Sequence, residues 1–188
     1  MQRNSFIVAL SALTTLPLLS FSSIEDVIGR KVKGFKVKAG EGRIHGHITL
    51  KGVNSNILDV KISGSDTDKD LAIFEQTSLT PGKGTPLHVH HFQDEMFYVL
   101  EGSYYFKVGE ETFDLNVGDS IFLPKKVPHA WTQVSERGKM LVIFQPAGKM
   151  ENFFVAVSQL DHEPSPKEME HLFADNEMKI VGPPLKIK

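Results

Sequence analysis

Residues 82–102 read GKGTPLHVHHFQDEMFYVLEG and contain two histidines, His88 and His90, that are separated by one residue. Side chains alternate between the two faces of a β-strand, so both imidazoles point to the same side if this segment is extended. Residues 92–94 predict a chain reversal, after which Glu95 opens the next strand and can reach back toward the histidines. The stretch therefore predicts two imidazoles and one carboxylate at a single point.

A second segment, residues 118–133, supplies a candidate fourth ligand. It reads GDSIFLPKKVPHAWTQ and predicts a strand, a proline-framed turn and a returning strand that begins with His129. Three neutral imidazoles and a carboxylate suit one borderline divalent ion, and Fe, Mn, Ni, Cu, Co and Zn all remain candidates. Such a ligand set leaves a coordination position open for water or substrate, which catalysis requires. The chain has no cysteine, so thiolate ligands and disulfides are excluded.

Short segments with a period of two predict β-strands along most of the chain. Besides the segment around His88 and His90, the expected strands are 43–50, 57–63, 71–77, 95–100, 103–108, 111–115, 120–123, 129–133, 139–145 and 153–157. No long helical stretch interrupts them, so the pattern predicts an all-β antiparallel sandwich or barrel. Alternating apolar and basic residues at 30–38 predict a further N-terminal edge strand with one solvated face.

The C-terminal part predicts one short helix. Ser165 is a capping serine, Pro166 occupies the first helical position and Glu168 completes a capping box. The apolar residues that follow at helical spacing are Met169, Leu172 and Phe173. This face is expected to pack on the barrel, and the Gly-Pro-Pro sequence at 182–184 is expected to end the ordered part.

Composition and length are those of an ordinary globular protein with one domain, expected at residues 23–188. The formal net charge of −2 gives no reason to expect binding to nucleic acid or to an anionic membrane surface. Residues 1–22 resemble an export signal, because Arg3 precedes an apolar run too short to span a bilayer and small residues surround Ser22. The protein is therefore expected to be periplasmic or secreted, with no membrane anchor after cleavage. The alternative is an N-terminal arm of a cytoplasmic protein.

The two histidine-bearing segments resemble the two motifs of the cupin superfamily. The first motif is glycine, five residues, His-x-His, four residues, glutamate, six residues, glycine, and it is complete from Gly82 to Gly102. The second motif begins at Gly118 and includes Pro124 and His129, but Lys126 replaces its glycine and Gln133 stands where the family prefers asparagine. The resemblance covers residues 71–157 closely. It implies a double-stranded β-helix, the jelly-roll barrel of cupins, with extra N-terminal strands and a short C-terminal helix.

Within the superfamily, residues 84–102 are similar to the quercetin dioxygenase group, and so is the chain ending 181–185. This resemblance implies a metal-dependent dioxygenase that acts on a flavonol-like or otherwise enolisable small molecule, with Glu95 as metal ligand, general base or both in turn. It also implies a homodimer paired through N-terminal strands. The same ligand set occurs in cupins that only bind small molecules and in isomerases and hydrolases, so these alternatives stay open.

Candidates for a substrate pocket follow from strand parity. Phe97 and Val99 share the parity of Glu95, and Trp131 shares that of His129, so the three side chains are expected on the metal-facing side or in the core. Lys125 and Lys126 are interpreted as a solvated turn, although they could attract an anionic substrate.

The remaining histidines near these segments are not expected to bind the metal. His91 has the opposite parity to His88 and His90. His45 and His47 form a second His-x-His, but no carboxylate follows at a matching distance, and the pair is expected on the surface.

Overall fold

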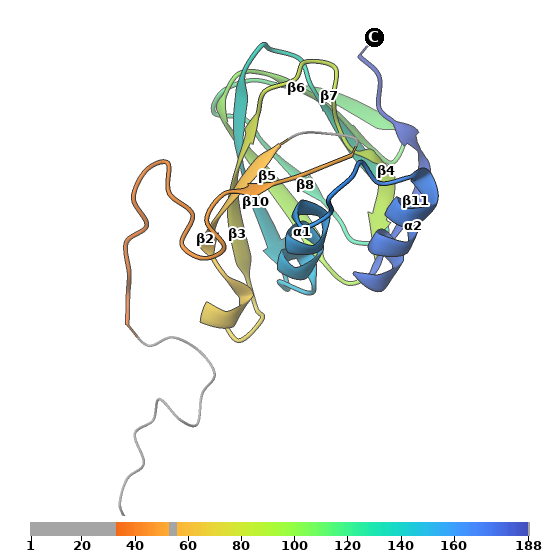
Figure 1. Cartoon of the computed structure of the whole chain (residues 1–188). Coiled ribbons are helices and arrows are strands. Elements are labelled where there is room, and N and C mark those ends of the chain that lie inside the picture. The colour runs from red at the N-terminus through yellow and green to blue at the C-terminus, as the bar shows by residue number, and fades with distance from the viewer. Residues whose placement is uncertain (1–32, 53–55, 188) are drawn as a thin grey trace, which may run out of the picture.

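The computed structural model describes residues 33–52 and 56–187, which form two antiparallel β-sheets (Figure 1). The larger sheet has the order β1-β2-β3-β10-β5-β8, with bounds Ile48–Thr49, Ile57–Ile62, Ala72–Ser78, Gly138–Gln145, Asp94–Glu101 and Ser120–Leu123. The smaller sheet has the order β11-β4-β9-β6-β7, with bounds Met178–Pro184, Pro86–His90, His129–Gln133, Tyr104–Val108 and Glu111–Leu115. The expected all-β jelly-roll architecture is confirmed.

The core lies between the two sheets, where their inward-facing side chains meet. In β3, β4 and β5 buried residues alternate with exposed or half-buried ones, as the period of two predicts. Phe74, Phe97, Tyr104, Phe106 and Phe144 are among the largest fully buried side chains. Burying each of these rings stabilises the fold by about 1.5–3 kcal/mol relative to an exposed ring.

One predicted strand is a helix. The expected strand 153–157 lies inside α1 (Met150–Ser158), whose buried residues are Met150, Phe153, Phe154 and Val157. A short apolar run of this kind fits a buried strand or a buried helix equally well from periodicity alone. Here the spacing of the buried positions, at i, i+3, i+4 and i+7, is helical.

The chain end also differs from expectation, because residues 182–184 do not end the ordered structure. They belong to β11, which pairs with β4 at the edge of the smaller sheet. Proline is tolerated at a sheet edge, where its missing N–H does not interrupt a ladder on the open side. The predicted C-terminal helix is α2 (Pro166–Asp175), and its capping box forms as expected.

The N-terminal strands are shorter than expected. The described residues 33–38 of the predicted edge strand form no strand, and the expected strand 43–50 is reduced to β1. His45 and Gly46 both have positive φ, which is incompatible with a continuous strand there. A 3-10 turn at Gly64–Asp66 follows β2.

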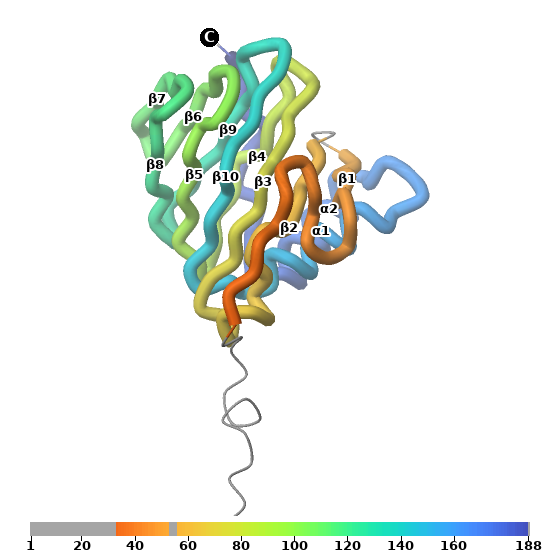
Figure 2. The backbone as a smooth tube through the Cα atoms, turned by 90° about the vertical axis from the view of Figure 1, so that its left-hand side faces the viewer, coloured from red at the N-terminus to blue at the C-terminus, as the bar shows by residue number. Residues whose placement is uncertain are grey.

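Helices α1 and α2 contact each other and lie at one end of the barrel (Figures 1 and 2). Helix α2 also contacts β11, and α1 contacts β1. The Phe173 ring of α2 also packs on the His88 ring, so α2 lies beside the histidines of β4.

The predicted signal peptide, residues 1–22, lies outside the described residues, as do positions 30–32 of the predicted edge strand. Among the helices that the structure describes, none has the length and apolar character needed to span a bilayer.

Candidate metal centre

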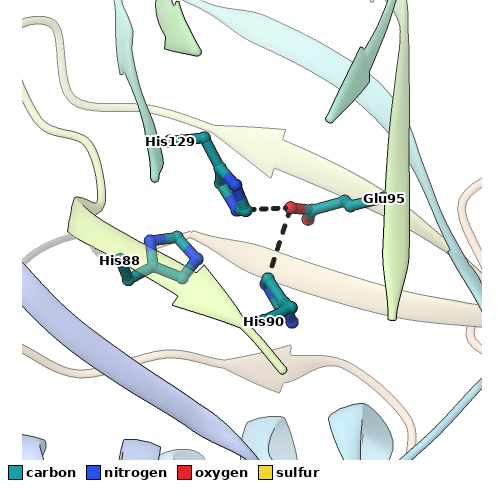
Figure 3. A group of neighbouring side chains, drawn as sticks. All are labelled: His88, His90, Glu95 and His129. Atoms are coloured by element: carbon teal, nitrogen blue, oxygen red, sulfur yellow. Dashed lines mark ion pairs between the residues drawn. The ribbon is translucent and has the colours of Figure 1, made fainter. Parts of the chain in front are cut away.

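Three strands from both sheets bring the predicted ligands together. Strand β4 carries His88 and His90 two residues apart, so both face the barrel interior, and β9 places His129 directly opposite His88. Glu95 comes from β5 in the other sheet, after the reversal at residues 91–93. Figure 3 shows the three imidazoles and the carboxylate converging on one point.

The four side chains are close enough to share one metal ion. One potential ligand atom from each of them lies within 4.8 Å of the others. Glu95 Oε2 is 3.2 Å from His129 Nε2 and 3.7 Å from His90 Nε2 (Figure 3). All four are buried, with exposed fractions between 1 and 6%.

Hydrogen bonds fix the orientation of two of the imidazoles. The Nδ1 atom of His88 lies 2.8 Å from the Pro86 carbonyl oxygen, and that of His129 lies 2.9 Å from the Val127 carbonyl oxygen. A carbonyl can only accept, so each Nδ1 carries the proton and each Nε2 presents a lone pair. These are the tautomers that a metal ligand requires.

The donor set passes a chemical test for a metal. The His129 Nε2 atom is buried and has no hydrogen-bond partner among the described residues. Buried polar atoms are nearly always satisfied, so an orphaned lone pair facing a carboxylate fits coordination of a cation. The residues present therefore fit one divalent ion.

The comparison with known proteins agrees with the fold and the site. The family model of the cupin domain matches residues 76–144, which include both motifs and all four candidate ligands. Residues 76–144 therefore form a cupin domain.

Similar proteins match parts of this cupin. An uncharacterized protein of Methanocaldococcus jannaschii is 40% identical over 48 residues, which are 26% of this chain and 38% of that protein. One of Streptomyces coelicolor is 36% identical over 56 residues, 30% of this chain and 53% of that protein. The chain thus spans between about a third and a half of the length of these relatives. An RmlC-like cupin from Shewanella frigidimarina is similar in structure, with 18% identity, a TM-score of 0.49, and coverage of 63% of this chain and 96% of that chain.

Burial keeps the three cupin histidines neutral. Burial and, to a smaller extent, the nearby His129 lower the pKa of His88 to about 3. Burial also lowers the pKa of His129 to about 4. The pKa of His90 is also well below its usual value, mainly because of burial. All three imidazoles are thus ready to donate a lone pair at neutral pH.

Glu95 has the opposite shift. Burial raises its pKa from 4.5 to about 8, and the nearby His88 opposes only part of that effect. Without a bound cation, the buried carboxyl therefore holds a proton near neutral pH, and a cation at the cluster would favour the ionised form. A carboxyl with this pKa is suited to proton transfer near pH 7.

An apolar cavity of about 70 Å³ adjoins the cluster. His88, His90 and Glu95 form part of its wall, and α1 and α2 supply much of the rest through Met150, Phe153 and Phe173. The Phe173 ring lies 5.3 Å from the His88 ring. The two C-terminal helices therefore close the cavity over the candidate metal position.

The predicted pocket residues divide into two groups. Trp131 and Phe97 line the cavity together with His88, His90 and Glu95. Val99 is fully buried in the core and is not among the residues that line the cavity. Lys51 and Phe154 also line it but were missed, because Lys51 lies just outside the expected strand 43–50 and residue 154 was assigned to a strand.

Other histidines and lysines of the motifs lie outside the cluster. His91 is exposed and does not belong to it, as strand parity predicts. His45 and His47 are exposed, and each contacts a carboxylate, Glu151 at 3.0 Å and Asp59 at 2.7 Å. They are surface residues, as expected.

The two motif departures have structural consequences. Lys126, which replaces the motif glycine, has a φ of +66°, and both Lys125 and Lys126 are exposed. Gln133 is buried, and its Oε1 accepts from the Thr80 N–H at 2.9 Å while its Nε2 donates to the Ser135 carbonyl at 2.8 Å. Gln133 therefore ties neighbouring loops to the end of β9.

Proposed function

We propose that this cupin binds one divalent metal through His88, His90, Glu95 and His129 and is an oxygenase for an enolisable small molecule. The observation that supports this most strongly is the buried cluster of three neutral imidazoles and one carboxylate beside an apolar cavity. Resemblance to the quercetin dioxygenase group supports the oxygenase class. The metal would supply Lewis acidity and the capacity to react with O₂.

In this proposal Glu95 takes the proton that the substrate loses when it enolises. Its carboxyl is buried at the cavity wall, and a cation at the cluster would favour the ionised form, which is the form that can accept a proton. The three histidines hold their lone pairs toward the metal position, and the aromatic walls exclude water from the reacting carbon atoms.

The size of the cavity favours a compact substrate. Its volume of about 70 Å³ is roughly half of the ~150 Å³ of an engineered cavity that binds benzene. By this comparison a flavonol with three rings, and also a small β-diketone, fits only if α1 and α2 move. The β-diketone requires the smaller movement and is therefore the better first substrate to test.

The experiment compares O₂ consumption by the full-length protein loaded separately with Fe, Mn, Ni, Cu, Co and Zn. Each form is incubated with β-diketones and flavonols in the presence and absence of air. We expect O₂ uptake with at least one metal and its loss in Glu95→Gln, while His91→Ala retains it. Absence of uptake with every metal would count against the oxygenase.

The same experiment distinguishes the other two candidate functions. Conversion without O₂ would indicate an isomerase or hydrolase. Tight binding of a compound that is recovered unchanged would indicate a cupin that binds small molecules without turnover.

Export and dimerisation are further parts of the proposal. Cleavage near Ser22 would be read from the mass of the mature chain, and a full-length N-terminus found only in cytosol would contradict export. The homodimer stays a prediction from family resemblance, and light scattering on the purified protein tests it.

A further inference from the structure

The imidazole of His90 differs from the other two in the surroundings of its Nδ1 atom. The Nδ1 atoms of His88 and His129 lie 2.8 and 2.9 Å from backbone carbonyl oxygens. The Nδ1 atom of His90 is buried on the side of the ring that faces away from Glu95, and no described residue accepts from it with good hydrogen-bond geometry (Figure 3). Buried polar atoms nearly always have a partner, so an acceptor is expected close to this atom.

A buried acceptor without a donor lies three residues away along the chain. The Gln93 side chain is 1% exposed, and its Oε1 atom has no well-aligned partner among the residues that the structure describes. Burial lowers the pKa of His90 most strongly, whereas the Gln93 side chain raises it, as an acceptor facing a ring N–H does. The two orphaned atoms are therefore neighbours of complementary type.

The Gln93 amide is held in one orientation. Its Nε2 donates to Glu177 Oε2 at 2.8 Å, and a carboxylate can only accept, so Oε1 is the other end of the amide. Gly148 makes room for this amide, because a Cβ at that position would lie 1.9 Å from Gln93 Nε2. The amide cannot exchange its two ends without turning Oε1 toward the carboxylate.

Glu177 is fixed in turn at the connection between α2 and β11. Its φ is +68°, and its carbonyl oxygen accepts from the His91 N–H at 3.0 Å. Its Oε1 lies 3.9 Å from the Nζ of Lys149, the residue that precedes α1. A series of polar side chains thus runs from the start of α1 through Glu177 and Gln93 toward His90.

We propose that Gln93 is a positioning residue for the metal: its Oε1 accepts the Nδ1 proton of His90 and so keeps the His90 Nε2 lone pair toward the ion. This inference rests on the proposed metal site and adds to it a residue that is not a ligand. Gln93 occupies one of the four variable positions of the first cupin motif, so the motif does not predict it. Removing such an outer partner of a metal-bound histidine typically costs about 10- to 100-fold in metal affinity.

Substitutions at Gln93 and Glu177 provide the test. Gln93→Leu removes the acceptor at similar volume. The double variant Gln93→Glu with Glu177→Gln exchanges the two end groups, so that a carboxylate faces His90 and an amide donates to that carboxylate. Gln133→Leu is the matched control, since Gln133 is also 1% exposed but its amide bonds to backbone atoms and not to a histidine.

The dissociation constant for Zn²⁺ is measured by chelator competition at neutral pH on the full-length protein, with circular dichroism as the check on folding. We expect Gln93→Leu to weaken Zn²⁺ binding roughly 10- to 100-fold. The double variant should recover most of the wild-type affinity, and Gln133→Leu should keep it even if its stability falls. Gln93→Met replaces Gln93→Leu if that variant does not fold.

Nuclear magnetic resonance separates positioning from a general loss of structure. In the Zn²⁺-loaded wild type, each of the three ligand imidazoles should show a protonated Nδ1 and a metal-bound Nε2. Gln93→Leu should shift the Nδ1 proton signal of His90 and leave those of His88 and His129 in place. The double variant should return the His90 signal to the hydrogen-bonded range.

Three outcomes would overturn the inference and leave the metal site intact: unchanged affinity in Gln93→Leu, an equal loss in Gln133→Leu, or a His90 Nδ1 proton that does not respond to Gln93→Leu. Absence of Zn²⁺ binding by the wild type would refute the proposed metal site and this inference with it.

Discussion

At the scale of single residues, the cluster is built from groups whose pKa values move in opposite directions. Burial lowers the pKa of the three histidines and raises that of Glu95 to about 8. At neutral pH the imidazoles therefore lose no proton when a metal binds, whereas Glu95 must lose one below its pKa.

This assignment predicts the pH dependence of metal affinity. Between pH 6 and 8 the affinity for Zn²⁺ should rise about tenfold per pH unit, because one proton leaves Glu95, and it should level off above about pH 8. Chelator competition at several pH values measures it. Glu95→Gln should bind more weakly and without this slope. Release of a second proton near pH 6.5 in the wild type would show that a histidine also loses a proton on metal binding, which would contradict the assignment.

Glu95 also affects the stability of the metal-free protein. Its folded pKa of about 8 exceeds the unfolded value of 4.5, so the folded state binds more protons between these limits. The free energy of unfolding should consequently fall as the pH rises from about 4.5 to 8, and the carboxyl stabilises the fold most below that window. In Glu95→Gln the contribution of this group is absent, so the fall in the free energy of unfolding between about pH 4.5 and 8 should disappear.

Lys126 offers a second test at this scale. Its φ of +66° is costly for a residue with a Cβ and nearly free for glycine, the residue that the cupin motif has here. Lys126→Gly should raise the free energy of unfolding by about 0.5–1 kcal/mol, measured by urea denaturation. The neighbouring Lys125 has a negative φ, so Lys125→Gly should lower stability, and equal effects of the two changes would contradict the argument.

At the scale of elements, alternation of side chains located most strands but not the helix that closes the cavity. The predicted bounds of β7, β8 and β9 coincide with the observed ones, because turn residues flank short segments of period two. The run from Phe153 to Val157 has no such punctuation, and its helical form depends on packing against Phe74, Phe144 and Phe173. Contacts of this kind between distant segments leave no local signal.

The C-terminal helices should control access to the metal. Phe173 of α2 packs on the rings of His88 and Phe153, with centroid separations of 5.3 and 4.9 Å. Phe173→Ala should cost about 3–5 kcal/mol of unfolding free energy and speed removal of the metal by EDTA. Leu172→Ala, at a half-buried position on the same helix, is the control and should change the rate little. Unchanged metal loss in Phe173→Ala would mean that access follows another route.

At the scale of the whole molecule, the two cupin motifs gave the ligand set because each segment fixes its own strand parity. The motifs could not predict the wall of the cavity, because Lys51 and the residues of α1 and α2 that line it lie outside both motifs. The ligands come from both sheets, three histidines from the smaller and Glu95 from the larger. A bound metal would therefore link the two halves of the barrel.

Elemental analysis of the full-length protein purified without added metal tests this assignment most directly. We expect about one divalent metal per chain, its loss in both His88→Ala and His129→Ala, and its retention in His91→Ala, where the histidine next to His90 is exposed. Metal retained at full stoichiometry in both His88→Ala and His129→Ala would contradict the site.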